Sequence, residues 1–202
     1  MAQALLFPLL EAGLVEPAAV QAVVATAASA QRLSQEHGLS VGTDPAEAWR
    51  APVVLLAVKP QQLPALAQTL TALEPAAAAA EVAGARRLLI SVLAGVSLSR
   101  LQGLFPTSVC VRAVPNTPAL VRAGLTALAW GEGIEPSRQA WVRALFARVG
   151  EVMELPETQL DAFLALTSSG PAFVALVAEA MADGAVAAGL PVDLARHLAH
   201  RT

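Results

Sequence analysis

Two short apolar segments constrain the fold of this chain more than any other feature. They are VVLLAVKP at Val53–Pro60 and SVCVRAVPNTP at Ser108–Pro118. Both are rich in β-branched residues and stop at a polar residue beside proline, a pattern typical of buried strands in a parallel sheet. Proline disfavours the helical conformation of the residue before it, so Lys59 and Val114 are expected to leave their strands extended. Because ligands bind outside the carboxyl ends of such strands, a ligand site is predicted there.

Strands and helices are predicted to alternate along most of the chain. Strands are expected at Ala19–Ala25, Leu39–Val41, Val53–Val58, Arg87–Leu93, Val109–Val114, Gly124–Trp130 and Gly150–Leu155. Helices are expected over Met1–Gly13, Ser29–His37, Gln61–Ala80 and Ser137–Val149, with short helices beginning near Asp44 and Ser97. The alternation predicts an α/β fold with a doubly wound, mostly parallel sheet.

The pattern changes to helix alone after Pro156, with small residues recurring as far as Gly189 and a further helix starting at Pro191. We therefore place a domain boundary between residues 155 and 156. Local signals set several helix ends: Gly13 is a C-terminal glycine, Ser29 can act as an N-cap, and Asp44 precedes a proline at the first helical position.

Hydrophobic residues make up 55% of the chain and its mean hydropathy is +0.57, which raises the question of a membrane segment. The longest charge-free stretch, Ala162–Ala178, is interrupted by Thr167–Pro171, and a spanning helix needs about 20 mainly apolar residues. No membrane span is therefore predicted. The first basic residue is Arg32, so no signal peptide is expected either.

The charge and the cysteine content restrict the function classes further. The net charge is −3 and the arginines are dispersed, so no basic patch supports nucleic-acid binding. Cys110 is the single cysteine; it excludes an internal disulfide and is interpreted as a small buried apolar residue. These features suit a soluble cytosolic protein.

Asn116 is the sharpest candidate for a binding residue. It lies in the arch Val114–Pro118, where two prolines limit the freedom of the chain. Its amide offers a donor and an acceptor, which suits a nicotinamide carboxamide or a polar substrate. An ordinary Asn-Thr turn, with the side chain bonded to its own backbone, explains the same residues. The spacing leaves both interpretations open.

Two further strand ends are candidates for contact with a nucleotide. Ala57–Pro60 contains Lys59, the only lysine of the chain, although a solvated lysine at a strand end is the simpler interpretation. Ala94 and Gly95 end the next strand with small residues that leave room for a flat ring. A strand-to-helix turn that needs glycine is the alternative there.

Thr26 and Ser29 follow the predicted strand Ala19–Ala25, with Arg32 nearby and no acidic residue to bond a ribose 2′-hydroxyl. This favours NADP over NAD, unless the segment is a plain polar loop. His197 and His200 have a spacing that can hold zinc, but no third ligand is evident, so no metal site is predicted. No nucleophilic triad or catalytic carboxylate pair stands out, and the catalytic residue stays unassigned.

Four segments together resemble the pyrroline-5-carboxylate reductase family. They are AVKP within Val53–Pro60, ISVLAGV at Ile90–Val96, VRAVPNTPALVRAG at Val111–Gly124, and SGPAFVALVAEAMADGAVAAGLP at Ser169–Leu190. They occur in the family's order and span almost the whole chain.

This resemblance implies both the architecture and the reaction. Residues 1–155 would form a Rossmann-type NAD(P)-binding domain, and residues 156–202 an all-helical domain for dimerisation and substrate binding. The activity implied is NAD(P)H-dependent reduction of 1-pyrroline-5-carboxylate to L-proline, the last step of proline biosynthesis. The expected cofactor is NADP, with NAD possible, and the expected assembly is a homodimer or higher homo-oligomer.

The resemblance also implies roles for individual positions. The nucleotide would be contacted by Ala57, Val58, Lys59 and Pro60, and the nicotinamide side by Ala94, Gly95 and Asn116. Residues expected near the substrate are Asn116, Thr117, Ser169 and Gly170.

The chain departs from the family pattern at several points. Family members begin with a strand and a GxGxM loop, whereas Met1-Ala2 resembles the end of that loop. We therefore expect the first strand and both leading glycines to be absent, and the sheet to lack a central strand. The later helices, with a serine-, glycine- and threonine-rich loop, are not found before Thr202. Ser168 replaces a usual glycine, and Pro52 stands where aspartate is common. We therefore expect an incomplete copy that is weakly active or inactive.

Two alternatives stay open from the sequence. One is a related two-domain dehydrogenase of the prephenate or ketopantoate type, against which the PNTP arch and the SGPAF segment argue. The other is a non-catalytic binding or interaction protein that kept the fold.

Overall fold

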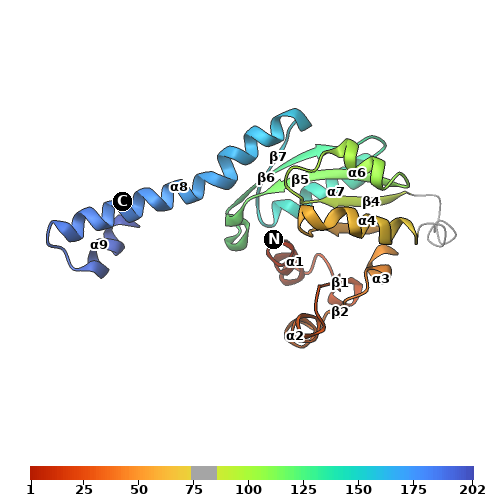
Figure 1. The fold of residues 1–202 in the computed structure, drawn as a ribbon, viewed down its shortest axis with the longest axis horizontal. Helices are drawn as coiled ribbons and strands as arrows, with labels where there is room; N and C mark the ends of the chain where they lie inside the picture. The colour runs from red at the N-terminus through yellow and green to blue at the C-terminus, as the bar shows by residue number, and fades with distance from the viewer. Residues whose placement is uncertain (74–85) are drawn as a thin grey trace. The chain divides into compact units, whose positions relative to one another are not determined.

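The computed structural model describes residues 1–73 and 86–202 (Figure 1). These residues divide into two compact units, Met1–Leu160 and Asp161–Thr202. The strands are β1 (Gln21–Val23), β2 (Ser40–Gly42), β3 (Val53–Leu56), β4 (Arg87–Ser91), β5 (Ser108–Pro115), β6 (Gly124–Trp130) and β7 (Gly150–Glu154). The helices are α1 (Ala2–Glu11), α2 (Ala27–His37), α3 (Pro45–Trp49), α4 (Leu63–Thr71), α6 (Leu98–Leu104), α7 (Pro136–Ala147), α8 (Leu160–Ala187) and α9 (Val192–Ala199). Short 3-10 segments are η1 (Pro17–Ala19), η2 (Pro60–Gln62), η4 (Thr117–Val121) and η5 (Glu157–Gln159).

The first unit is an α/β fold with a mostly parallel sheet, as the sequence predicts. Five strands pair in the order β3-β4-β5-β6-β7, and β3, β4 and β5 are mutually parallel. The β5–β6 pair is antiparallel, which the sequence analysis did not foresee. The reason is the short η4 connection, because a parallel crossover needs about a dozen or more residues.

The β1 and β2 strands form a parallel pair separate from the five-stranded sheet. This separation is consistent with the prediction of a doubly wound, mostly parallel sheet that lacks its first strand. Among the described strands, β1 pairs only with β2 and β3 pairs only with β4. One edge of β3 and one edge of β1 therefore have no strand partner within the described residues.

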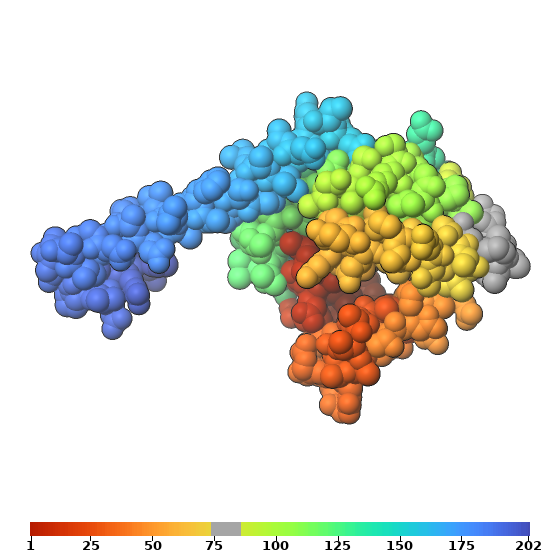
Figure 2. All heavy atoms as spheres, in the orientation of Figure 1, coloured from red at the N-terminus to blue at the C-terminus, as the bar shows by residue number. Residues whose placement is uncertain are grey.

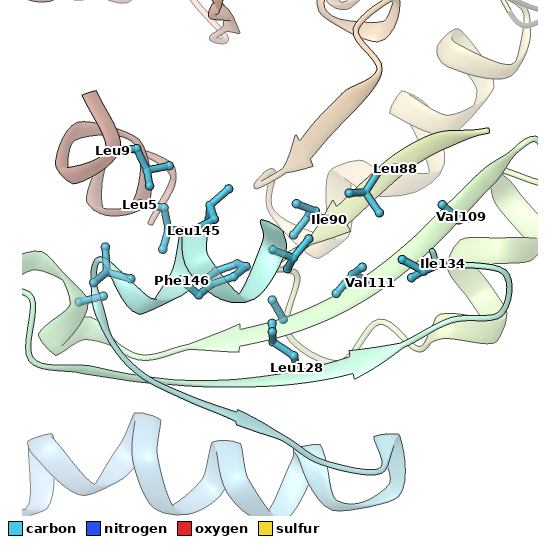
Figure 3. Close-up of a cluster of buried hydrophobic side chains, with 14 residues drawn as sticks. Leu5, Leu9, Leu88, Ile90, Val109, Val111, Leu128, Ile134, Leu145 and Phe146 are labelled. Atoms are coloured by element: carbon cyan, nitrogen blue, oxygen red, sulfur yellow. The ribbon is translucent and has the colours of Figure 1, made fainter. Parts of the chain in front are cut away.

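One face of the five-stranded sheet packs against α1 and α7 (Figure 3). Alternate residues of a strand point to the same face, and here β4 contributes Leu88 and Ile90 while β5 contributes Val109 and Val111. Phe146 of α7 is fully buried in this cluster. Each such large apolar side chain contributes about 1.5–3 kcal/mol on burial, so this layer fixes which side of each strand faces α7.

The opposite face of the sheet is covered by α4 and α6, which lie over it on the side turned to the viewer (Figure 2). Leu63 of α4 and Leu101 of α6 are both fully buried. The ring centroids of Trp49 and Phe105 lie 5.1 Å apart, and both side chains are buried. Strands β4 and β5 are thus covered on both faces, as their continuous apolar sequences predict.

Most of the predicted helix ends are confirmed. Gly13, which follows α1, has a φ of +63°, in the left-handed region that favours glycine. The Asp44 carboxylate accepts the backbone N–H of Ala46 at 2.9 Å at the start of α3. The Ser97 hydroxyl accepts the backbone N–H of Arg100 at 3.2 Å at the start of α6.

The predicted cap of α2 is wrong. Thr26, not Ser29, is the N-cap: its Oγ1 accepts the backbone N–H of Ser29 at 3.2 Å. Thr26 has extended backbone angles, with φ −133° and ψ 144°, which is the conformation of an N-cap residue. The helix therefore begins two residues earlier than the sequence analysis placed it, at Ala27.

Several predicted elements have shorter bounds in the structure. The strand expected over Ala19–Ala25 is limited to β1, because Pro17–Ala19 forms the 3-10 segment η1. The helix expected over Gln61–Ala80 is represented by α4, and its predicted end lies in residues 74–85, outside the described residues.

The second unit consists of α8 and α9. Helix α8 continues through Pro171, so the polar interruption at Thr167–Pro171 does not break it, contrary to the argument made from the sequence. A long helix tolerates one proline, which removes a single backbone hydrogen bond. The helical stretch Glu157–Ala187 is long and apolar enough to cross a membrane by length and composition alone.

A polar cluster on β6, α7 and β7 joins three side chains. The Trp130 indole N–H donates to Glu154 Oε2 at 2.9 Å, and Arg143 Nη1 donates to Glu154 Oε1 at 2.5 Å. The hydrogen bond from Trp130, with a smaller contribution from Arg143, lowers the pKa of Glu154 below its ordinary value. A carboxylate whose pKa is lowered on folding stabilises the protein above its unfolded pKa, and this stabilisation is lost as the pH falls through the folded pKa.

We predict that Glu154→Gln lowers the melting temperature at pH 7 by about 1–3 °C, because the pair is largely solvated. The difference from the wild type should shrink as the pH falls towards 3, where the wild-type carboxylate is itself protonated. Differential scanning fluorimetry over this pH range measures the effect. Glu151→Gln, an exposed acid on the same strand, is the matched control and should show a smaller change at every pH. A pH-independent difference for Glu154→Gln would contradict the assignment.

Candidate functional site

The carboxyl ends of β3, β4 and β5 lie at one edge of the sheet, because the three strands are adjacent and parallel. The register aligns Leu56 with Ser91 and Ser91 with Arg112. Lys59, Ala94 and Asn116 follow these aligned residues by three or four positions. The structure thus brings three of the sequence-predicted segments to one edge, which we call the rim: Ala57–Pro60, Ala94–Gly95 and Asn116–Thr117.

The first part of the rim follows β3. Lys59 is exposed and has the extended conformation expected for a residue before proline, with φ −69° and ψ 139°. Its backbone N–H donates to Gln62 Oε1 at 3.3 Å, at the start of η2. Ala57, Val58 and Pro60 are half-buried. The backbone here is therefore held in place while the ammonium group of Lys59 stays accessible.

The second part of the rim is the turn after β4. Ala94 and Gly95 are both exposed, and Gly95 has a φ of +69°. A Cβ built on Gly95 would meet nothing within 4 Å, so the space above the turn is open. The positive φ alone accounts for the glycine, while the small side chains leave a flat surface that a ring could approach.

Asn116 forms the third part, and its side chain is almost fully buried, at 5% exposure. Its Oδ1 accepts the backbone N–H of Leu125 at 2.8 Å, and its own backbone N–H donates to the Leu125 carbonyl at 3.2 Å. The amide oxygen thus bridges to β6 instead of closing a turn on its own backbone. Thr117, at the start of η4, is exposed beside it.

Thr26 and Ser29 lie at the carboxyl end of β1, at the start of α2, and not on the five-stranded sheet. Their hydroxyls are bonded to each other at 2.9 Å. Arg32 on the next turn of α2 is paired with Glu36 at 2.9 Å on the surface. The polar loop therefore has a capping function of its own.

Ser169 and Gly170 lie within α8, in the second unit. Ser169 is exposed, and a Cβ on Gly170 would meet nothing within 4 Å.

A hollow of about 500 Å³ between α1 and η4 was not predicted from the sequence. Its lining residues are Gln3, Ala4, Phe7, Pro8, Glu11, Leu120, Val121 and Arg122. Leu120 and Val121 are 68% and 75% exposed. Arg122, which has a left-handed φ of 59°, forms an ion pair with Glu11. The η4 segment begins within the PNTP arch, at Thr117, and this arch was the signal available in the sequence.

Cys110, the single cysteine of the chain, is buried in β5. Burial raises the pKa of the Cys110 thiol to about 11, so this thiol stays protonated at neutral pH, which agrees with its interpretation as a buried apolar residue. In the part of the chain that the structure describes, no cluster of three His, Cys, Asp or Glu side chains could hold a metal ion.

Comparison with known proteins identifies the family. The family model for pyrroline-5-carboxylate reductase dimerisation matches residues 157–202, and the model for NADP oxidoreductase, coenzyme F420-dependent, matches residues 1–95. A Thermus thermophilus pyrroline-5-carboxylate reductase is 38% identical over 200 residues, which are 98% of this chain and 72% of the relative. The chain belongs to the pyrroline-5-carboxylate reductase family.

Two further matches agree with this reductase family. A pyrroline-5-carboxylate reductase from Synechocystis is 45% identical over 172 residues, covering 84% of this chain. The solved reductase from Coxiella burnetii superposes with a TM-score of 0.85 at 28% identity, over 99% of this chain and 72% of that one. The chain spans 60% of the length of the Synechocystis relative.

We predict that Asn116→Ala destabilises the first unit by about 1–3 kcal/mol, because it removes the acceptor of the Leu125 N–H at a buried position. Urea denaturation followed by tryptophan fluorescence measures the loss. Thr117→Ala, at the exposed neighbouring position, is the control and should change stability by less than about 0.5 kcal/mol. Equal effects of the two substitutions would show that the Asn116 bridge carries no stability.

Proposed function

We propose that this member of the reductase family reduces 1-pyrroline-5-carboxylate to L-proline with NADPH as the hydride donor. The observation that carries the proposal is the sequence identity of 38–45% to two proteins named pyrroline-5-carboxylate reductase. The position of the rim also supports the proposal, because nucleotides bind at the carboxyl ends of parallel strands in such sheets. Family membership favours this reaction over that of a prephenate or ketopantoate dehydrogenase.

The described residues fit a bound dinucleotide. The open turn at Ala94 and Gly95 offers backbone to a flat ring, since no neighbouring atom fills the space above Gly95. Thr26 and Ser29 lie at the N-terminus of α2, where backbone N–H groups favour a phosphate. No acidic residue occupies Ala25–Arg32. We therefore assign Ala57, Val58, Lys59 and Pro60 to the nucleotide, Ala94, Gly95 and Asn116 to the nicotinamide side, and Thr26 and Ser29 to the 2′-phosphate of NADP, with NAD as the weaker cofactor.

NADPH, when bound, supplies the hydride for this reaction. The imine nitrogen of the substrate carries a proton, so its carbon is already electrophilic and the nitrogen keeps that proton in the product amine. The chain then has to hold two reactants in contact and exclude water, which requires no side chain with a shifted pKa. The rigid arch at Asn116 and Thr117 would orient the ring and the substrate, with Ser169 and Gly170 also near the substrate.

We further propose that the 202 residues alone are weakly active, because their sequence contains no glycine-rich GxGxM loop for the pyrophosphate. We propose that residues 1–155 bind the cofactor and that residues 156–202 serve dimerisation and substrate binding. We also propose that the enzyme is cytoplasmic.

The proposal is tested with two proteins. One is the chain itself, and the other is a fusion in which the segments of the Synechocystis relative outside the matched region flank it. With NADPH and 1-pyrroline-5-carboxylate, the fusion should form proline at least about tenfold faster than the chain alone, since the complete site orients both reactants. In the fusion, Lys59→Ala should weaken NADPH binding about tenfold, as the loss of one charged contact to phosphate, whereas Gln61→Ala should not.

Proline formation is measured by chromatography and NADPH binding by fluorescence titration. A fusion that binds NADPH but leaves the substrate unreduced, under conditions in which the Synechocystis enzyme works, would overturn the proposal. It would favour a non-catalytic binding protein instead.

The exposed apolar residues of α8 support a homo-oligomer. Phe173, Val174, Leu176 and Val177 are each more than 60% exposed. An apolar surface of this kind is typical of a protein or membrane contact. Because the dimerisation model matches residues 157–202, we propose that a second copy of the chain covers this surface, and not a membrane.

We predict that the purified chain is a dimer or larger oligomer and that Val177→Glu makes it monomeric, because a charge in an apolar interface is costly to bury. Light scattering coupled to size-exclusion chromatography gives the mass. Glu179→Gln, at an exposed polar position of the same helix, should leave the oligomer intact. A monomeric wild type that floats with liposomes would instead identify α8 as a membrane contact.

A further inference from the structure

An ion pair with a buried guanidinium and a half-buried carboxylate links β5 to η5, beside the start of α6. Arg112 is in the middle of β5 and is only 4% exposed. Its Nη1 lies 3.3 Å from Glu157 Oε1, at the start of η5. Withdrawing a charged group from water is costly and needs a compensating partner. The presence of a charged residue at this buried position, Arg112, therefore suggests a specific role.

The Glu157 carboxylate has a second partner that ties it to the rim. Its Oε1 accepts the backbone N–H of Leu98 at 2.6 Å. Leu98 is the first residue of α6, and the Ser97 hydroxyl caps the same turn. One carboxylate oxygen thus bonds both a guanidinium on β5 and the beginning of α6. The segment between β4 and α6, which contains Ala94 and Gly95, is therefore anchored at its far end by Glu157.

The other end of this segment begins at the end of β4, which pairs with β5. Ser91, the last residue of β4, is paired in register with Arg112 and is fully buried. The Ser91 hydroxyl accepts the backbone N–H of Leu93 at 3.4 Å. On the other strand, Arg112 lies four positions before Asn116. The strand that carries Asn116 thus pairs with the near end of the turn through the sheet register, and it reaches the far end of the turn through the Arg112–Glu157 pair.

We propose that Arg112 and Glu157 are positioning residues for the nicotinamide side of the rim. They fix the position of the Ala94–Gly95 turn relative to Asn116. The surface formed by these three residues is therefore in place before any ligand binds. Neither residue is placed in contact with cofactor or substrate. This inference rests on the proposed function for its consequence in cofactor binding, but the anchoring of the turn can be measured in the protein without ligand.

Variants of Glu157 separate the anchoring from the charge. Glu157→Ala removes the acceptor of the Leu98 N–H. Glu157→Gln keeps one acceptor oxygen at the same reach, removes the charge and replaces the second oxygen by an NH2 group. Glu154→Gln is the matched control, because Glu154 is also bonded to an arginine, Arg143, but lies in the surface cluster on β7. Glu157→Asp, whose carboxylate is one methylene shorter, serves if the alanine variant does not fold.

Hydrogen exchange followed by mass spectrometry reports on residues 93–100 in the chain without ligand. Glu157→Ala, or Glu157→Asp in its place, should speed exchange there by about tenfold or more, as expected for the loss of a hydrogen bond to a charged group. Glu157→Gln should stay within about threefold of the wild type if the acceptor oxygen is what holds the turn. Glu154→Gln should leave exchange in this segment unchanged.

NADPH titration of the fusion protein provides the second readout. The dissociation constant should rise about tenfold or more for Glu157→Ala and stay near the wild-type value for Glu157→Gln, because ligand affinity depends on how well the site is pre-formed. Arg112→Lys, which keeps the charge but loses the planar fork, should fall between them.

Unchanged exchange in Glu157→Ala or Glu157→Asp, or equal effects of alanine and glutamine, would overturn the positioning role. Faster exchange without any change in NADPH affinity would also overturn it, because the turn would then be anchored for stability alone. If the wild-type fusion does not bind NADPH, the proposed function fails while the exchange experiment still decides whether Glu157 anchors the turn.

Discussion

The burial of β4 and β5 on both faces is the constraint on which the rest of the first unit depends. Helices α1 and α7 cover one face and α4 and α6 the other, so successive residues of these strands alternate between two apolar layers. A shift of one residue would exchange the two layers, which fixes the register. Because β3 is parallel to this pair, all three strands end at one edge. The rim is thus a consequence of the core.

The sequence predicts the bounds of some strands well, but it predicts strand direction and helix caps less well. The position of β6 follows from its composition, and its bounds agree with the prediction to the residue. Its direction against β5 does not follow from its own residues, because only the length of the η4 connection excludes a parallel crossover. The cap of α2 was misplaced because threonine and serine three positions apart are both good caps. The local sequence alone does not distinguish which of the two residues caps α2.

The contacts that shape the rim were harder to predict. Arg112 and Glu157 are 45 residues apart, and no periodicity or motif links an arginine inside an apolar strand with a glutamate beyond the last strand. The role of the Asn116 amide was likewise open between ligand and turn, and it proved to bridge to β6. Several polar groups at the rim therefore have structural partners as well as proposed ligands. Such a surface loses little conformational freedom when it binds.

The separation of β1 and β2 from the five-stranded sheet has a consequence for handling the protein. The carbonyls of Pro52 and Leu56 accept hydrogen bonds from Leu88 of β4 and from Val92, the residue after β4. The backbone groups of Val53 and Leu55 are therefore directed away from β4. Among the described strands none pairs with that side of β3. An edge of this kind is a template for an extended segment of a neighbouring molecule and promotes aggregation on concentration or heating. Aggregates formed through this edge would gain β-structure, whereas association through α8 would not.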